Sequence, residues 1–395
     1  MKKKVVLAFS GGLDTSYCVK YLKHDLDLEI HSVIVNTGGF DEVELQEIEK
    51  KAHTLGVTKH LAVDVTSEYY EKCIKYLLFG NVLKNDSYPL SVSSERTFQA
   101  IAIAEYAHKI KADYIAHGST GAGNDQVRFD AVFAFIAPEV AVLTPIRDNR
   151  LSREAEIEYL KKHGVDVSWE KAKYSINVGL WGTSVGGSET LTSDLALPES
   201  AWPTQLTKND DLKISIDFSN GQVVGIDGVK MKPVVAIKHL NKLAGAYAIG
   251  RDTHVGDTII GIKGRVGFEA PAALILIKAH QLLEKHIQTK WQIYWKKQLS
   301  EWYGMLLHEG QYFEPVMRDV EAFLDSSQKN ITGKVFVHLH PYRFELIGIE
   351  SKYDLMKSKS GVYGEMNNNW TDEDVKGFTK IYSNQVKIWN QVNKE

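Results

Sequence analysis

The feature that most restricts the fold of this chain is an alternation of short apolar runs with longer, polar-faced segments over residues 1–165. The apolar runs have the length of buried strands, and the segments between them have helical periodicity. Strands are predicted at Val5–Phe9, Glu29–Val35, His60–Val65, Tyr114–His117 and Ala141–Thr144, and helices at 15–24, 41–55, 68–79, 95–109 and 152–163. This order predicts an α/β domain with a doubly wound parallel sheet. Ligands of such sheets bind beyond the carboxyl ends of the strands, so the loops after the strands are the candidate sites.

The pattern of the chain changes after residues 164–175, which we interpret as a domain boundary. Residues 179–211 are rich in Gly, Ser, Thr and Pro and lack periodicity, which is typical of a functional or mobile stretch. Hairpins are predicted at 213–218 with 222–227 and at 334–340 with 343–349, and helices at 233–244, 270–287, 291–307 and 313–325. The sequence therefore predicts a first domain at 1–165 and a second, α+β domain at 166–369.

A third segment, residues 370–395, is predicted to form a C-terminal helical arm. Thr371 is a natural N-cap, and the acidic residues that follow it favour a helix start. One helical face carries the apolar side chains of Val375, Phe378, Tyr382, Val386 and Trp389. An amphipathic helix must bury such a stripe, either by folding back on its own core or by contacting another subunit.

The composition excludes several classes of protein. Lys and Arg number 47 against 50 Asp and Glu, a net charge of -3, whereas a duplex-binding protein usually carries a basic excess. The two cysteines, Cys18 and Cys73, form no C-x-x-C pair, which excludes a disulfide framework and a cysteine zinc cluster. The apolar run after the N-terminal lysines is too short for a signal peptide, and no run is long enough for a membrane span. We therefore expect a cytoplasmic protein with no nucleic-acid or membrane partner.

Two clusters of chemically suggestive side chains are interpreted as structural. His338 and His340 lie on one face of a predicted strand, but the sequence offers no third metal ligand beside them, so we interpret them as a surface or packed pair. Trp291, Trp295 and Trp302 recur at near-helical spacing, which is more typical of a core or subunit interface than of a base-stacking platform.

The loop Ser10–Ser16, with the sequence S-G-G-L-D-T-S, lies between the first predicted strand and helix. Glycines there let the backbone approach phosphate oxygens, and the N–H groups of the loop and of the helix N-terminus form an anion site. Asp14 would repel a phosphate unless a divalent cation bridges the two. The loop matches neither the G-x-x-x-x-G-K-[ST] nor the G-x-G-x-x-G pattern.

A second loop, His117–Phe129, follows the fourth predicted strand and should lie at the same sheet edge. It places groups of both charges within a few residues, which suits a zwitterionic amino acid. Arg128 is a natural partner for a carboxylate and Asp125 for an ammonium group.

The first loop resembles the S-G-G-x-D-[ST] loop of the ATP pyrophosphatases, which cleave ATP between its α and β phosphates. The second, H-G-S-T-G-A-G-N-D-Q-V-R-F, resembles that of the argininosuccinate synthase family. Further matches are D-S-Y-P-L-S-V-S-S-E-R, Y-S-I-N-V-G-L-W-G-T-S and the segments at 250–251, 261–265 and 268–272. The resemblance covers nearly the whole chain. It implies a nucleotide domain, a synthetase domain and a homotetramer with interlocked C-terminal arms.

The implied reaction is the arginine-biosynthetic ligation of L-citrulline and L-aspartate, in which ATP yields AMP and pyrophosphate. In the implied mechanism the ureido oxygen of citrulline attacks the α-phosphate, and the aspartate amine then displaces AMP from citrullyl-AMP. Orientation and loop donors suffice without a protein nucleophile. Asp14 would act through Mg²⁺, Asp125 would position the aspartate ammonium group and assist its deprotonation, and Arg128 completes the catalytic set.

The resemblance also implies which residues contact each substrate. ATP would be bound by Ala8, Phe9, Ser10, Gly11, Gly12, Leu13, Asp14, Thr15, Ser16, Val35 and Gly118. Aspartate would be bound by Thr120, Asn124 and Asp125. Citrulline would be bound by Tyr88, Ser93, Asn124, Arg128, Ser175 and Ser184.

The chain departs from the family pattern at several positions. Where the family usually has Tyr-Ser-x-Asp-Glu-Asn, this chain continues with Asn177, Val178 and Gly179, and Gly256 and Phe268 replace a Glu and a Tyr that contact citrulline. Each lost charged hydrogen bond is worth ~1.5–3 kcal/mol. The possible substitutes are Asp257, Asp194 and Glu189. An alternative function is therefore a related synthetase with a modified amino-acid substrate.

Overall fold

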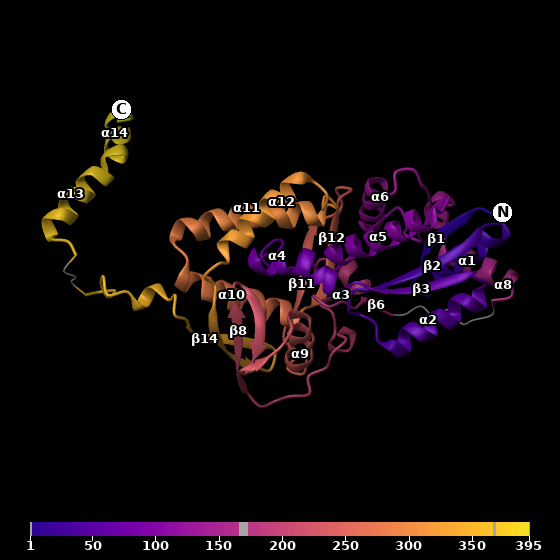
Figure 1. Cartoon of the computed structure of the whole chain (residues 1–395), viewed down its shortest axis with the longest axis horizontal. Coiled ribbons are helices and arrows are strands. Elements are labelled where there is room, and N and C mark those ends of the chain that lie inside the picture. Colours follow the sequence, from indigo (N-terminus) through magenta and orange to yellow (C-terminus); the bar gives the residue numbers. More distant parts are fainter. Residues whose placement is uncertain (1, 166–172, 366–368, 395) are drawn as a thin grey trace.

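The computed structural model describes residues 2–165, 173–365 and 369–394. Figure 1 shows two adjoining lobes, one built by the N-terminal half and one by the C-terminal half, with an arm that extends from the second lobe. The predicted boundary between 165 and 166 borders residues that lie outside the described ranges.

The N-terminal half forms a five-stranded parallel sheet, which confirms the predicted fold class. The order is β3-β2-β1-β4-β5. The strands are β1 Lys4–Ala8, β2 Glu29–Asn36, β3 Lys59–Asp64, β4 Tyr114–Ala116 and β5 Ala141–Leu143. In β1, Val5 and Leu7 face one core and Val6 faces the other, which explains why this strand is apolar on both faces.

Helices cover both faces of this sheet. The core that contains Val5 also contains residues of α1 Leu13–His24 and α2 Glu42–Leu55, and α8 Arg153–Lys162 packs on α1. The opposite face is covered by α5 Ser91–Ile110, which packs against α6 Asp125–Ile136, and the short α7 Pro145–Asp148 follows β5. Helix α5 begins four residues before the predicted 95–109 helix, and α6 was not predicted because its first turn coincides with a motif that we interpreted as a loop.

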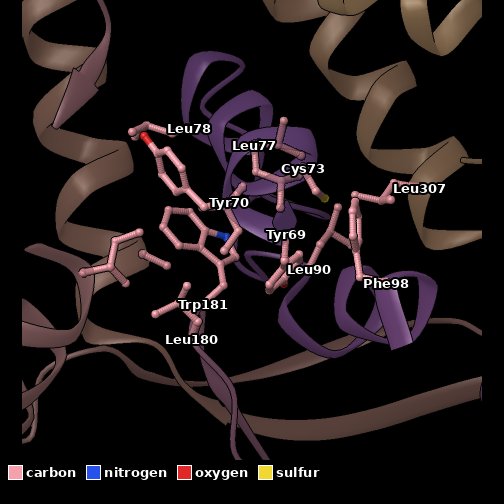
Figure 2. Close-up of a cluster of buried hydrophobic side chains, with 14 of the residues drawn as sticks. Tyr69, Tyr70, Cys73, Leu77, Leu78, Leu90, Phe98, Leu180, Trp181 and Leu307 are labelled. Atoms are coloured by element: carbon pink, nitrogen blue, oxygen red, sulfur yellow. The ribbon is translucent and has the colours of Figure 1, made fainter. Parts of the chain in front are cut away.

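A helical segment of the first half belongs to the core of the second. It consists of α3 Thr66–Tyr69, a π-helical turn at Tyr70–Ile74 and α4 Lys75–Phe79. Figure 2 shows its side chains packed with Leu180, Trp181 and Leu307, all of which come from the second half. The two halves therefore share one continuous hydrophobic core.

The second half contains two antiparallel sheets. The first has the order β10-β9-β8-β13-β14, and the second β11-β12-β7-β6. Their strands are β6 Ser175–Asn177, β7 Thr183–Gly186, β8 Leu212–Ser219, β9 Gln222–Ile226, β10 Val229–Lys230, β11 Arg251–Asp257, β12 Lys263–Glu269, β13 Gly333–His340 and β14 Arg343–Glu350. The predicted hairpins correspond to β8–β9 and β13–β14. The four-stranded sheet was not predicted, because its strands are rich in glycine and charged residues, which have low strand propensity.

Four helices of the second half match the four predicted segments within two residues at every end. They are α9 Pro233–Gly245, α10 Pro271–Ile287, α11 Lys290–His308 and α12 Pro315–Ser327. Short 3₁₀ turns occur at Ser188–Leu191, Glu199–Ala201 and Leu355–Lys357. Among the described residues, none of the helices combines the length and apolarity that a bilayer crossing requires.

The C-terminal arm consists of α13 Asp372–Tyr382 and α14 Asn384–Val392 rather than one helix. Thr371 forms the predicted N-cap. The helix is interrupted at Ser383, whose hydroxyl donates to the carbonyl of Thr379. All members of the predicted apolar stripe are exposed, Phe378 by 63% and Trp389 by 65%. The arm extends away from the body (Figure 1), so of the two alternatives for this stripe the structure does not show the one in which it folds back on its own core.

Candidate functional site

The predicted site residues meet at a cavity of about 1290 Å³ between the two lobes. It lies at the carboxyl ends of β1 and β2 and is closed on the other side by residues of β6, β7, β11 and β12. Of the residues proposed to bind ATP, citrulline or aspartate, all line it except Gly11 and Ser16. Ser16 is fully buried and donates to the carbonyl of Gly12, so its role is to stabilise the turn.

The Ser10–Ser16 loop forms the floor of one end of the cavity. Gly12 is the N-cap of α1, and no side chain caps the first N–H groups of the helix, which by helix geometry lack intrahelical partners. Gly11 has a φ of 76°, a left-handed conformation that favours glycine, and its carbonyl accepts from Lys51 Nζ at 2.6 Å. The loop therefore presents backbone donors and hydroxyls to the cavity, as a phosphate site requires.

Asp14 lines this part of the cavity beside a second acidic group, Glu156 of α8. Burial and the Asp14 carboxylate raise the pKa of Glu156 to about 8, and one oxygen of Glu156 is buried without a hydrogen-bond partner. Two neighbouring carboxyl groups beside a phosphate cradle are the oxygen donors that Mg²⁺ prefers. The residues present therefore fit a divalent cation bound with a phosphorylated ligand.

The second predicted loop reaches the same cavity because His117 is anchored from two sides. Its Nε2 lies 3.0 Å from the Asp130 carboxylate, and its Nδ1 accepts from the backbone N–H of Ser119. Arg147 binds the other oxygen of Asp130 at 2.8 Å. Gly118 lies so close to the first loop that a Cβ atom on it would be 3.2 Å from the Cβ of Asp14. The two motifs therefore meet at one sheet edge, as predicted.

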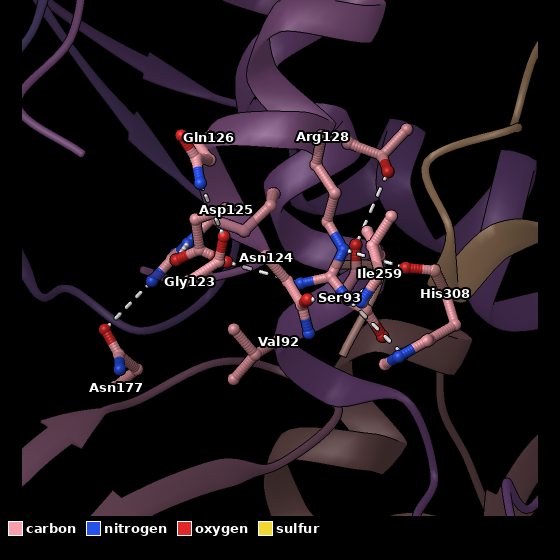
Figure 3. A network of polar contacts seen from close by, with 12 residues as sticks. Val92, Ser93, Gly123, Asn124, Asp125, Gln126, Arg128, Asn177, Ile259 and His308 are labelled. Carbon is pink, nitrogen blue, oxygen red and sulfur yellow. Dashed lines mark hydrogen bonds and ion pairs between the residues drawn. The ribbon is translucent and has the colours of Figure 1, made fainter. Parts of the chain in front are cut away.

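Asp125, the first residue of α6, is held by two guanidinium groups, of which Figure 3 labels that of Arg128. Arg96 of α5 donates to it at 2.9 Å, and Arg128 at 3.3 Å. Although burial by itself would raise the pKa of Asp125, these two cations lower it below the ordinary value. Asp125 is therefore a fixed negative charge in the cavity wall.

Arg128 makes most of its hydrogen bonds to the second half of the chain. Its Nε and Nη2 donate to the carbonyl oxygen of His308 at 3.0 and 2.8 Å, and Nη2 also donates to Nδ1 of His308 (Figure 3). Burial, with Arg128 nearby, lowers the pKa of His308 to about 3, so its imidazole is neutral. Because Nδ1 accepts, Nε2 carries the proton, and this buried N–H has no partner.

Asn124 links α6 to the turn between β11 and β12. Its Oδ1 accepts from the backbone N–H of Ile259 at 2.8 Å, which leaves its amide N–H groups for the cavity that it lines. This contact positions the β11–β12 hairpin over the site. It joins residues that are far apart in the sequence, so the sequence alone did not indicate it.

The other end of the cavity has aromatic walls. The Tyr88 ring stacks on His254 with 5.0 Å between centroids and packs on the buried Phe268 at 5.3 Å. A Cβ atom at Gly256 would lie 2.6 Å from Nε2 of His254, so the missing side chain at 256 makes room for this imidazole. Both ring nitrogens of His254 are buried without partners. Ser93 and Ser184, also buried, complete this side.

Only one of the three candidate substitutes for the missing family groups lines the cavity. Asp257 does so, but it is 67% exposed and pairs with Lys263 at 2.7 Å. Glu189 contacts Tyr174 and Ser188 instead, and neither it nor Asp194 belongs to the cavity wall.

The structure also adds site residues that the sequence motifs did not identify. These are Glu95, Arg96, His254 and His308, all in the cavity wall. Glu95 and Arg96 end the segment D-S-Y-P-L-S-V-S-S-E-R, which is one of the matches to the family. Their charges in this segment were therefore a signal that could have identified them. The two histidines carried no such signal, because their partners lie on other elements.

The His338–His340 pair has a neighbour that the sequence analysis missed. Glu345 of β14, paired with His338 in the sheet, brings a third potential ligand atom within 4.8 Å of those of both histidines. His338 contacts Asp211 at 2.5 Å, and Glu345 is bound by Arg343. The statement that no third ligand is near was therefore wrong, although these side chains already have polar partners in the protein.

Comparison with known proteins gives a consistent result. Residues 4–166 match the family model described as arginosuccinate synthase N-terminal HUP domain, and residues 174–389 match the arginosuccinate synthase C-terminal domain. The chain is 37% identical to the argininosuccinate synthase of Sulfurisphaera tokodaii, covering 98% of this chain and 99% of that protein. It is 36% identical to that of Methanocaldococcus jannaschii over the full length of both, and 35% identical to that of Xylella fastidiosa over 99% of this chain and 98% of that protein.

Proposed function

The chain belongs to the argininosuccinate synthase family, and from that premise we propose how its residues divide the work. The family reaction is the ATP-dependent ligation of citrulline and aspartate in arginine biosynthesis. The observation that carries our assignment is the meeting of the Ser10–Ser16 and His117–Phe129 loops at one cavity.

ATP is proposed to bind with its phosphates on the Ser10–Ser16 loop. The free N–H groups at the start of α1 and the hydroxyls of Ser10 and Thr15 would bind the phosphate oxygens. Asp14, with Glu156 beside it, would hold Mg²⁺. When bound, this ion would neutralise charge on the triphosphate and on the departing pyrophosphate. Gly11 and Ser16 support the loop conformation rather than the ligand.

Citrulline is proposed to bind against the aromatic end of the cavity, with Tyr88 and Ser184 in contact with it. The ureido oxygen would then face the α-phosphate, attack it and expel pyrophosphate, forming citrullyl-AMP. Alignment of the reacting atoms is worth up to ~7–11 kcal/mol. Arg128 would bind citrulline through the part of its guanidinium that His308 and Asp125 leave free.

Aspartate is proposed to bind at Thr120, Asn124 and Asp125. Asp125 suits the ammonium group because its charge is held at neutral pH by Arg96 and Arg128. The same pairing makes it a weak proton acceptor. We therefore assign it a positioning role, in contrast to the expectation that it assists deprotonation.

The decisive assay measures pyrophosphate release from ATP while each amino acid is omitted in turn. We expect release that requires citrulline and argininosuccinate formation that requires both substrates. Release independent of citrulline would contradict the assignment. The side chain missing at Gly256 supports the alternative of a modified amino-acid substrate, so citrulline homologues belong in the same assay. A homologue preferred over citrulline would establish that alternative.

We propose a homotetramer in which the C-terminal arm contacts other subunits, supported by its exposed apolar stripe. Phe378→Asp is expected to reduce the size of the assembly because it places a charge in that stripe, whereas Lys387→Asp on the polar side should leave it unchanged. Light scattering after size-exclusion chromatography measures both. Equal masses for Phe378→Asp and the parent protein would count against an interface at the arm.

The proposed division of the chain is a nucleotide domain at 1–165, a synthetase domain at 166–369 and an oligomerisation segment at 370–395. A cytoplasmic location is proposed because both Cys18 and Cys73 are buried free thiols, which suits a reducing compartment.

A further inference from the structure

Glu95 is a buried carboxyl group in the wall of the substrate cavity. It lies on the first turns of α5, is 1% exposed, and its Oε1 has no hydrogen-bond partner. A buried carboxyl oxygen without a partner is costly, so a group at such a position calls for an explanation. None of the roles described above uses it.

The surrounding backbone is shaped to admit this side chain. At Gly179 a Cβ atom would overlap Oε1 of Glu95, so only glycine leaves space for the carboxyl group. The segment is held there because Leu180 N–H donates to the carbonyl of Thr37 at 3.2 Å. Gly179 belongs to the stretch in which this chain departs from the family pattern. The carboxyl group of Glu95 is therefore buried against the backbone at the position where this chain departs from the family pattern.

The groups that face Glu95 keep it ready to exchange a proton. Burial raises its pKa to about 8, against the opposing effects of Arg96 and of a hydrogen bond from the Thr37 hydroxyl, and Asp125 adds to the rise. The buried phenols of Tyr69 and Tyr88 also interact with it. Near neutral pH it therefore exists in both forms, as a general base for a weakly acidic group should.

The ligation needs such a base. Aspartate reaches the enzyme with an α-ammonium group, which has no lone pair for attack on the ureido carbon. Asp125 cannot fill this role well, because two arginines hold its pKa low. Glu95 and Asp125 interact across the same cavity and have opposite pKa shifts, which is the pattern by which two carboxyl groups take separate roles.

We propose that Glu95 is the general base that takes a proton from the α-ammonium group of aspartate in the second half of the reaction. This inference rests on the proposed function. One N–H bond of the ammonium breaks and its proton moves to the Glu95 carboxylate. The freed lone pair forms the new C–N bond to the ureido carbon, and the C–O bond to AMP breaks with its electron pair on the AMP phosphate. The second proton lost by nitrogen leaves on that phosphate, and Glu95 returns its proton to water.

The test separates the two halves of the reaction in Glu95→Gln, a change of almost equal shape. The first half is the burst of pyrophosphate from ATP and citrulline without aspartate, which we expect to stay near the wild-type rate. The second is argininosuccinate formation after aspartate is added, which we expect to fall by about 10²–10⁴-fold. Glu105→Gln, on the exposed side of the same helix, is the matched control and should alter neither half.

The pH profile supplies a second readout that a purely structural role would not move. In the parent enzyme the rate of the aspartate step should rise with pH through an apparent pKa near 8, because the carboxylate form accepts the proton. Glu95→Gln should lack this limb. The proposal is overturned if the variant keeps the aspartate step and its pH limb, or if it loses both half-reactions equally. A parent enzyme without citrulline-dependent pyrophosphate release would instead contradict the proposed function.

Discussion

Lys296→Met is expected to lower the free energy of unfolding by about 3–5 kcal/mol. Lys296 of α11 places its ammonium group 2.7 Å from Oε2 of Glu284 on α10, and each side chain is only 3% exposed. The ammonium also donates to the carbonyl of Phe79 at the end of α4. Methionine fills a similar volume but leaves the Glu284 carboxylate charged, buried and without its cation. Urea unfolding at pH 7 measures the difference.

The neighbours of this ion pair explain why the loss should be large. Asn81 and Gln328 donate to the two oxygens of Glu284. These hydrogen bonds fix the carboxylate, so it cannot reorient toward the solvent. Lys297→Met on the same helix is the control, because Lys297 is 73% exposed and lies 3.9 Å from Glu301, a surface pair worth ~0.3–0.5 kcal/mol. Adding Glu284→Gln to Lys296→Met should restore part of the stability. A loss below 1 kcal/mol in the single variant would contradict the argument.

Asp14→Asn is expected to reduce citrulline-dependent pyrophosphate release by about 10²–10³-fold, the usual loss when one preorganised electrostatic group at a reacting centre is removed. The amide keeps the shape of the side chain but removes the charge proposed to hold Mg²⁺ beside the Ser10–Ser16 loop. Steady-state pyrophosphate release over a range of Mg²⁺ concentrations measures the effect. The loss should appear in kcat rather than in the binding of ATP, because the loop backbone proposed to bind the phosphates is unchanged.

A matched control distinguishes this role from a structural one. Asp27→Asn alters an exposed carboxylate near the same helix and should leave turnover unchanged. Asp14→Asn should retain the melting temperature of the parent protein, because relief of the contact with Glu156 offsets the lost charge. Unchanged turnover in Asp14→Asn would refute the proposed role of Asp14.

The sequence predicted well those features that depend on neighbouring residues. The apolar run at Val5–Phe9 predicted a strand buried on both faces, and the loop after it was expected at the sheet edge, where Asp14 lines the cavity. That this loop binds phosphate stays a prediction. Both inferences need only residues within a few positions of each other. The same is true of the Thr371 cap, which forms through contacts over three positions.

Features that depend on distant residues were not predictable in this way. The Arg128–His308 contact spans 180 positions, and nothing near Arg128 indicates that its guanidinium is held by that carbonyl. The side chain missing at Gly256 predicted a lost citrulline contact, but not that His254 occupies the space. The carboxyl group of Glu95 could be located only once Gly179 was placed beside it. The residues around each member of these pairs carry no sequence signal that indicates the other member.

The shared core has a consequence for how the protein is made. The helical segment around Tyr70 emerges from the ribosome early, yet its apolar side chains pack against Trp181 and Leu307 (Figure 2). At ~5–20 residues per second, Trp181 follows Tyr70 after about 6–22 s and Leu307 after about 12–47 s. Until then the nascent N-terminal lobe exposes the apolar side chains of this helical segment. Slow codons between residues 180 and 307 would lengthen this interval and lower the yield of native enzyme without changing a single amino acid.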